Sequence, residues 1–238
     1  MLWNGFECEE FEFEGHYAII VMPEKKVESP RLLIKTEYFN AFPDTEIALL
    51  NRGFYLGFIK NDNRWGTAAD IERKARFIKF CTEKYGLVQK CVPVGMSCGG
   101  IFAIKLAAMH PELVSCIYID APVVNYMSCP CGFGSGNPLS ENLDEILGAL
   151  GLDAAGLLAC RDMPLDCLAK LVGNKIPAVL VAGDSDTVVP YRENGAFVKR
   201  AYEGSGVDYE EHIKPGCDHH PHGLEDSSPV VEFICNHK

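Results

Sequence analysis

The sequence from residue 95 to residue 100 reads Gly95-Met96-Ser97-Cys98-Gly99-Gly100. It follows an apolar run at 90–94, which we predict to be a buried strand, and precedes a helix-like run at 101–109. A serine between two glycines at a strand-to-helix corner is the nucleophile-elbow pattern G-x-S-x-G. The flanking glycines avoid clashes at so sharp a turn, and the last glycine lets the helix pack close to the strand. The pattern therefore predicts that the Ser97 hydroxyl projects into a cleft.

On both sides of this elbow the chain alternates between strand-like and helix-like segments. Strands are predicted over 7–13, 17–22, 31–35, 54–59, 90–94, 116–119, 177–182 and 209–214. Helices are predicted over about 45–51, 68–85, 101–109, 142–148, 154–160, 164–172, 192–202 and 229–236. Such alternation predicts parallel strands joined by right-handed crossovers, and therefore an α/β fold.

Three residues whose side chains can take part in catalysis lie just past predicted strand ends, namely Ser97, Asp186 and His219. In parallel sheets, sites form in the loops beyond the carboxyl ends of the strands, so these residues are expected at one edge. A serine hydroxyl needs a positioned base, histidine titrates in the right range, and a carboxylate fixes the histidine tautomer. The three residues therefore predict nucleophilic catalysis.

With serine, acid and histidine in this order, the chain resembles the α/β-hydrolase superfamily, particularly its esterase-like members. The resemblance runs from the strand at Arg31 to the last helix. It is carried by Gly95-Met96-Ser97-Cys98-Gly99-Gly100, by Gly183-Asp184-Ser185-Asp186 with Val189-Pro190, and by Gly216-Cys217-Asp218-His219. It implies a single α/β-hydrolase domain over 1–238, with a mostly parallel central sheet flanked by helices. Residues of about 123–174 are expected to form a small helical cap insertion.

The resemblance also implies a role for each matching residue. Ser97 takes the place of the nucleophile, and Asp186 that of the acid, three positions after the strand-ending glycine and in preference to Asp184. His219 takes the place of the base. His220 stays open as a second choice, because Asp218 stands where the family more often has glycine.

Two backbone N–H groups are expected to form an oxyanion hole. The family places the first on the residue after the nucleophile, here Cys98. The second belongs to the loop after the strand at 31–35, where this chain reads Thr36-Glu37-Tyr38-Phe39 instead of the usual His-Gly start. We expect Tyr38 to supply it.

The predicted activity is hydrolysis of a carboxylic ester by a serine hydrolase through an acyl-enzyme, with a small acyl group that a carbohydrate could carry. The motif does not separate esters from other acyl compounds, so a peptidase or thioesterase on the same triad stays an alternative. A non-catalytic binding protein on the same fold is a further one. Four aromatic or sulfur-bearing loop residues are candidates for the substrate pocket or for plain packing: Trp65, Tyr126, Met127 and Phe133.

The loop that carries the predicted base contains three histidines, His219, His220 and His222, with Cys217 and Asp218 beside them. Imidazole, thiolate and carboxylate groups at this spacing suit a transition metal, which is a third interpretation of the loop. Cys129-Pro130-Cys131 is too short a spacing for an ordinary zinc knuckle. We expect no cofactor and no metal in the catalytic site.

Charge and composition indicate which kinds of binding partner and which cellular compartment to expect. The formal net charge of −11 argues against binding nucleic acid. No apolar run approaches the roughly 20 residues that span a bilayer, so no membrane partner is expected. Eleven scattered cysteines and the lack of a secretory signal in this sequence favour reduced thiols in the cytoplasm, with a removed signal peptide as the open alternative. The sequence carries no signal for an oligomeric state.

Overall fold

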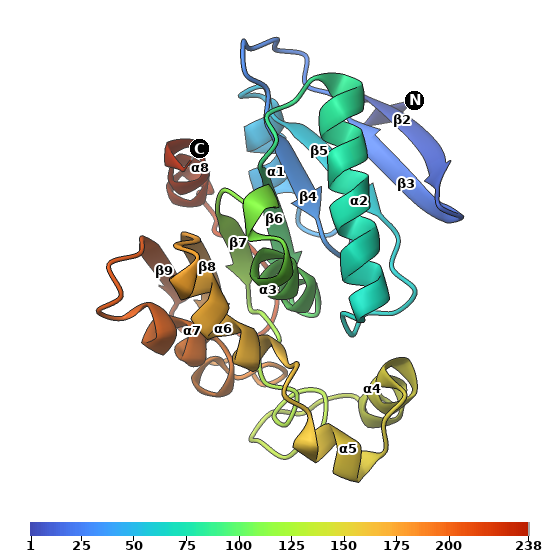
Figure 1. The fold of residues 1–238 in the computed structure, drawn as a ribbon. Helices are drawn as coiled ribbons and strands as arrows, with labels where there is room; N and C mark the ends of the chain where they lie inside the picture. Colours follow the sequence, from blue (N-terminus) through green and yellow to red (C-terminus); the bar gives the residue numbers. More distant parts are fainter. Residues whose placement is uncertain (238) are drawn as a thin grey trace.

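A mixed β-sheet runs through the centre of the molecule (Figure 1). In the computed structural model, which describes residues 1–237, nine strands pair in the order β1-β2-β3-β5-β4-β6-β7-β8-β9. The strands are β1 Leu2–Trp3, β2 Phe6–Phe13, β3 His16–Val21, β4 Leu32–Lys35, β5 Tyr55–Ile59, β6 Cys91–Met96, β7 Ile117–Asp120, β8 Ala178–Gly183 and β9 Tyr209–Lys214. The strands from β5 to β9 in this order run parallel, while β1, β2 and β3 form an antiparallel edge.

The central strands β4, β6, β7 and β8 are buried along their whole length, and they are apolar except for Lys35 and Asp120, which end β4 and β7. Within β4, Leu32 and Ile34 join the core on one face, whereas Leu33 joins the core on the other. The same alternation separates Ile117 from Tyr118 in β7. Continuous apolar strands are typical of parallel sheets that carry helices on both sides.

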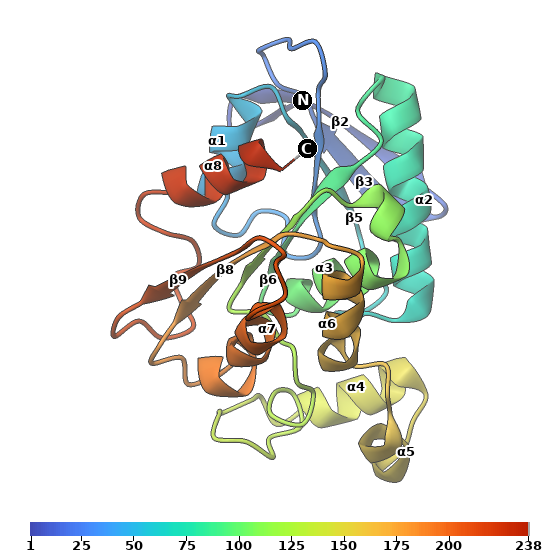
Figure 2. The ribbon, with the colours of Figure 1, turned by 60° about the vertical axis from the view of Figure 1, so that its left-hand side comes forward.

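Helices cover both faces (Figure 2). They are α1 Asp44–Leu50, α2 Ala68–Tyr85, α3 Gly99–Met109, α4 Asn142–Leu150, α5 Ala154–Ala159, α6 Pro164–Gly173, α7 Gly195–Tyr202 and α8 Ser228–Asn236. Helices α1 and α8 lie on one face, and α2, α3, α6 and α7 lie on the other. This arrangement confirms the predicted α/β class, with a mostly parallel central sheet flanked by helices.

Several bounds differ from the predicted ones by a residue or two, and three of the differences have a structural reason or bear on the site. Strand β1 is two residues long, too short for any alternation to reveal it. Strand β6 extends to Met96, so the elbow begins directly at Ser97. Helix α7 begins at Gly195 instead of 192, after a short 3₁₀ turn, because the Asn194 side chain accepts backbone N–H groups outside the helix.

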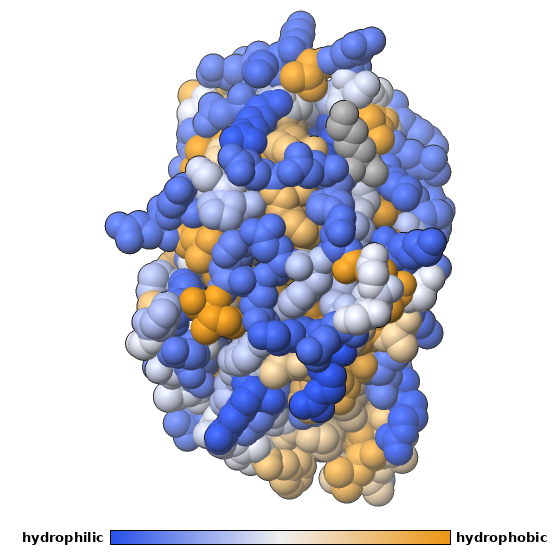
Figure 3. Space-filling view, turned by 90° about the vertical axis from the view of Figure 1, so that its left-hand side faces the viewer, coloured by the Kyte–Doolittle hydropathy of each residue, from blue (hydrophilic) through white to orange (hydrophobic). Residues whose placement is uncertain are grey.

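The segment between β7 and β8 contains the residues predicted as a cap. Helices α4 and α5 lie beyond the end of the sheet, whereas α6 packs along α3 (Figure 1). The space-filling view shows hydrophobic surface at this lower end of the molecule (Figure 3), and the segment exposes Phe133, Leu139 and Leu158. The assignment of 1–238 to one domain with a cap at 123–174 stays a prediction, and residue 238 lies outside the described residues.

Two further expectations concern membrane-spanning helices and the cysteine thiols. Among the helices of residues 1–237, none combines the length and the apolar character needed to cross a membrane. All eleven cysteines fall within this range, and all are free thiols there. Eight of them are buried, while Cys160, Cys217 and Cys235 are partly exposed.

Candidate active site

Ser97 occupies a sharp turn between β6 and α3, with its backbone at φ 51°. A Cβ added to Gly95 would lie 2.4 Å from the carbonyl oxygen of Gly99, and one added to Gly100 would lie 2.4 Å from Cβ of Pro122. Real Cβ atoms do not approach heavy atoms so closely, so both positions require glycine. The Ser97 N–H donates to the carbonyl of Asp120 on the neighbouring strand β7 at 2.9 Å, which fixes the turn to the sheet.

Three side chains from distant parts of the chain form a hydrogen-bonded line. The Oγ of Ser97 lies 3.0 Å from Nε2 of His219, and Nδ1 of His219 lies 2.8 Å from Oδ2 of Asp186. The other carboxylate oxygen of Asp186 accepts the backbone N–H groups of Val188 and Val189 at 2.9 and 2.7 Å. His219 and Asp186 are both buried.

The hydrogen bonds define what this line can do. A carboxylate only accepts, so His219 donates its Nδ1–H to Asp186 and presents an unprotonated Nε2 to the Ser97 hydroxyl. A base in this tautomer is positioned to take the serine proton. The arrangement is therefore capable of activating Ser97 as a nucleophile.

The alternatives that the sequence left open lie elsewhere. The carboxylate of Asp184 accepts the Ser185 hydroxyl at 2.9 Å and the Gly216 N–H at 2.7 Å, and it makes no hydrogen bond with His219 within residues 1–237. The His220 side chain makes no hydrogen bond within residues 1–237 and stacks on Phe42, with ring centroids 5.7 Å apart. The structure thus brings Asp186 and His219 to Ser97, and not Asp184 or His220.

Asp218, which stands where the resemblance led us to expect glycine, holds the histidine loop in place. Its carboxylate accepts the backbone N–H of Thr187 at 2.7 Å and that of His219 at 2.8 Å. These hydrogen bonds lower the pKa of the Asp218 carboxyl, with the Thr187 N–H as the largest cause. The unusual residue therefore ties the loop of the histidine to the loop of Asp186.

The expected oxyanion donors lie on two segments that contact each other. Within residues 1–237 the backbone N–H groups of Cys98 and Tyr38 have no hydrogen-bond partner. The Thr36 hydroxyl lies 2.7 Å from the carbonyl oxygen of Gly99, which holds the loop after β4 against the elbow. Asn61 donates to the Thr36 carbonyl at 2.9 Å from the other side. Cys98 is also the N-cap residue of α3, and the N-terminal end of a helix favours negative charge.

The side chains of these two residues are uncharged at neutral pH. Burial and the neighbouring Cys98 thiol raise the pKa of Tyr38. Burial likewise raises the pKa of the Cys98 thiol. A thiol is a nucleophile only as its thiolate, so Cys98 does not compete with Ser97.

A second histidine–carboxylate pair lies beside the first, and the sequence does not predict it. His222 Nδ1 lies 2.7 Å from Oδ1 of Asp120, and both side chains are buried. The other oxygen of Asp120 accepts the Gly223 N–H at 2.7 Å. Asp120 ends the strand next to the elbow strand, and an acid at such a strand end is the signal that could have identified it.

The four candidate pocket residues differ in how far they are buried. Trp65 and Tyr126 are buried in the core, and the Tyr126 hydroxyl donates to the Trp65 carbonyl at 2.9 Å. Met127 is partly buried against the same core, whereas Phe133 is 71% exposed. Trp65 borders a cleft of about 490 Å³, and Glu37, the residue before Tyr38, also lines it.

No protein-family model matches this chain, and no curated protein matches it. Solved structures do. A puromycin hydrolase superposes with a TM-score of 0.72 at 18% identity over 96% of this chain. A Mycobacterium tuberculosis puromycin-hydrolyzing peptidase gives 0.73 at 14% identity over 97%. The Pyrococcus horikoshii acylaminoacyl peptidase gives 0.69 at 13% identity over 90%.

The matches cover only part of those proteins, since this chain spans 37% to 38% of the length of the three. At these identities the likeness concerns the fold. It agrees with the mixed sheet, the helices on both of its faces and the strand–serine–helix turn at Ser97. This chain has the α/β-hydrolase fold.

Proposed function

We propose that this protein is a serine hydrolase that cleaves acyl compounds with Ser97, His219 and Asp186. The hydrogen-bonded line from Ser97 Oγ through His219 to Asp186, at 3.0 and 2.8 Å, is the observation that carries the proposal. His219 takes the proton of Ser97 as the hydroxyl attacks the carbonyl carbon, and later gives a proton to the leaving group. Asp186 keeps its charge beside the imidazolium that forms.

The backbone N–H groups of Cys98 and Tyr38 are proposed to bind the oxyanion of the tetrahedral intermediate. Both groups are free of other hydrogen bonds in the described part of the chain, and the two segments are held together through Thr36. Donors that are fixed before the reaction stabilise developing charge without reorganising during it. The loop after β4 supplies this function without the His-Gly start usual in the family.

For the substrate we propose an amide bond of a peptide or aminoacyl compound. The similar structures are a puromycin hydrolase and two peptidases, and this supports an amide substrate over the ester that the sequence favours. The same acyl-enzyme chemistry serves both, but an amine leaves only after His219 protonates it. A small carboxylic ester is the second candidate, because its leaving group makes the lesser demand.

The thiols bear on the compartment in which the protein acts. Eleven free thiols suit a reducing compartment, so we propose the cytoplasm.

The cleft beside Glu37 and Trp65 bears on how the substrate binds. It adjoins the proposed oxyanion loop, and we propose that it receives one side of the substrate.

A substrate panel tests the proposal. Aminoacyl and dipeptidyl 7-amido-4-methylcoumarins are compared with p-nitrophenyl esters of rising chain length, with the Ser97→Ala variant as the blank. Hydrolysis of an amide above the Ser97→Ala blank supports the amide assignment. Ester hydrolysis alone favours the second candidate, and no hydrolysis together with an unreactive Ser97 favours a non-catalytic binding protein.

A further inference from the structure

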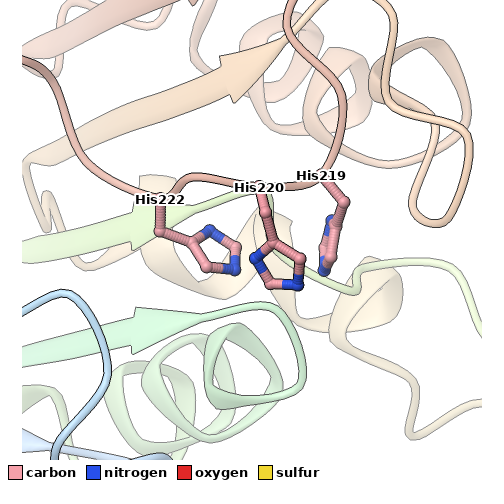
Figure 4. Close-up of side chains that lie close together, drawn as sticks. All are labelled: His219, His220 and His222. Atoms are coloured by element: carbon pink, nitrogen blue, oxygen red, sulfur yellow. The ribbon is translucent and has the colours of Figure 1, made fainter.

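Three histidines converge beside Ser97. The loop after β9 carries His219, His220 and His222, and their rings lie next to one another (Figure 4). The ring centroids are 4.9 to 5.0 Å apart in all three pairs. One ring nitrogen from each residue lies within 4.8 Å of the other two.

Two of these rings have the outer partners that metal-binding histidines have. Asp186 faces Nδ1 of His219 at 2.8 Å, and Asp120 faces Nδ1 of His222 at 2.7 Å. A histidine that binds a metal almost always donates its other N–H to a carboxylate, a carbonyl or water. Each carboxylate fixes the tautomer of its ring, leaves Nε2 unprotonated, and adds negative charge that a cation would offset.

We propose that His219, His220 and His222 bind a divalent transition-metal ion such as Zn²⁺ through one ring nitrogen each. Imidazole suits Zn²⁺, Cu²⁺ and Ni²⁺, whereas Mg²⁺ and Ca²⁺ prefer oxygen ligands. Asp218 takes no part, since its carboxylate is engaged by the Thr187 and His219 N–H groups. The site is therefore a three-nitrogen set with an open fourth position.

The rings need a small movement to close on the ion. Zinc–nitrogen distances of about 2.0–2.1 Å in tetrahedral geometry separate the ligand atoms by roughly 3.4 Å, against the 4.8 Å limit within which they lie here. His220 can supply this movement, because it is exposed and its side chain has no hydrogen bond in the described residues. Phe42 stacks on the same ring and limits where it can turn.

Metal binding has a consequence that rests on the proposed function. The Nε2 of His219 is the atom that faces Ser97 at 3.0 Å. An ion on that atom removes the base from the serine, so the proposed site is inhibitory. The existence of the metal site itself does not depend on catalysis.

A Co²⁺ titration in the Ser97→Ala background tests the site without using activity. Visible d–d absorption reports tetrahedral Co²⁺ in full-length Ser97→Ala protein and in three double variants. His110→Gln is the matched control, because His110 pairs with Glu72 outside the cluster. We expect unchanged binding with His110→Gln, and binding weakened by at least about tenfold with His220→Gln and by about 10- to 100-fold with Asp120→Asn. His220 is exposed, so its variant is expected to fold. Binding by His220→Gln as tight as by His110→Gln would overturn the proposal.

A second measurement tests the inhibition. Zn²⁺ is added to the wild type and to the His220→Gln variant, both with Ser97 intact. For each protein, the rate of fluorophosphonate labelling with Zn²⁺ is compared with its rate without metal. We expect Zn²⁺ to slow labelling, EDTA to restore it, Mg²⁺ and Ca²⁺ to have no effect, and His220→Gln to abolish the Zn²⁺ effect. Unchanged labelling at Zn²⁺ concentrations that saturate the site would refute the inhibitory role. Absence of labelling without metal would refute the proposed function and leave the Co²⁺ result to decide the site.

Discussion

Replacing Gly95 with alanine tests the geometry of the elbow. The new Cβ would lie 2.4 Å from the Gly99 carbonyl oxygen, 2.6 Å from the Gly99 carbonyl carbon and 2.8 Å from the Gly100 nitrogen. All three are backbone atoms at the start of α3, so none can rotate away as a side chain would. Overpacking of a well-packed core costs about 1–3 kcal/mol. Because the contacts are with backbone, we expect Gly95→Ala to lower the free energy of unfolding by about 3 kcal/mol, the upper end of that range.

The same substitution is expected to disturb the site. The only relief for the clash is movement of α3 away from β6, and this shifts Ser97 and Cys98 relative to His219. A misplacement of about 1 Å in an active site can lower the rate by about 10²-fold. We therefore expect Gly95→Ala to lose labelling at Ser97 well beyond what the unfolded fraction explains.

The matched control is Gly148→Ala. Gly148 is exposed on helix α4, and a Cβ there meets no atom within 4 Å. Alanine is favoured over glycine inside a helix by about 0.5–1 kcal/mol, so this variant should gain stability. Urea denaturation followed by circular dichroism measures both variants. A Gly95→Ala protein as stable as the wild type, or a Gly148→Ala protein equally destabilised, would contradict the reasoning.

Three further predictions concern the acid, a pH-sensitive loop and the thiols. Asp186→Asn places an amide NH₂ against either the His219 Nδ1–H or the two backbone N–H groups that Asp186 accepts. We therefore expect kcat to fall on the order of 10⁴-fold in the substrate panel. A change under tenfold would be inconsistent with a role for Asp186. Hydrogen bonds from Ser128 and Ser135 hold the pKa of Glu193 below its usual value, so its stabilising contribution is present above the unfolded-state pKa and is lost as pH falls through the folded one. Glu193→Gln should therefore make the free energy of unfolding fall less steeply below about pH 5 than in the wild type, and parallel curves would argue against it. Iodoacetamide under native conditions should modify only Cys160, Cys217 and Cys235, which are partly exposed. Burial raises the pKa of the other thiols, for example to about 12 at Cys81 and Cys116. Alkylation of Cys81 or Cys116 before unfolding, detected by mass spectrometry, would contradict this.

The fold is predictable from sequence where the determinants are consecutive in the chain. The elbow combines an apolar strand, two spacing glycines and a helix within 20 residues of chain, and the clashes at Gly95 and Gly100 show why the pattern is so restrictive. The two-residue strand β1 and the delayed start of α7 escape prediction, because one depends on pairing and the other on the distant contacts of Asn194.

The candidate site is predictable only in part. The order of Ser97, Asp186 and His219 is visible in the sequence, but the choice between His219 and His220 depends on how their loop is held. That loop is fixed by Asp218 against Thr187, a contact across 31 residues. The position of Asp120 at a strand end could have indicated the acid, but its pairing with His222 joins residues 102 positions apart and no local pattern reveals it.

Labelling of Ser97 by a fluorophosphonate is the most direct test of the proposed function. The reagent phosphonylates a serine only when a positioned base activates its hydroxyl, so it reports the Ser97–His219 contact itself. The metal-free protein is treated in its folded state, and the modified residue is located by mass spectrometry. We predict one adduct, on Ser97, formed in the wild type and lost in the His219→Ala variant and after denaturation. A folded wild-type protein whose Ser97 stays unmodified would contradict the account.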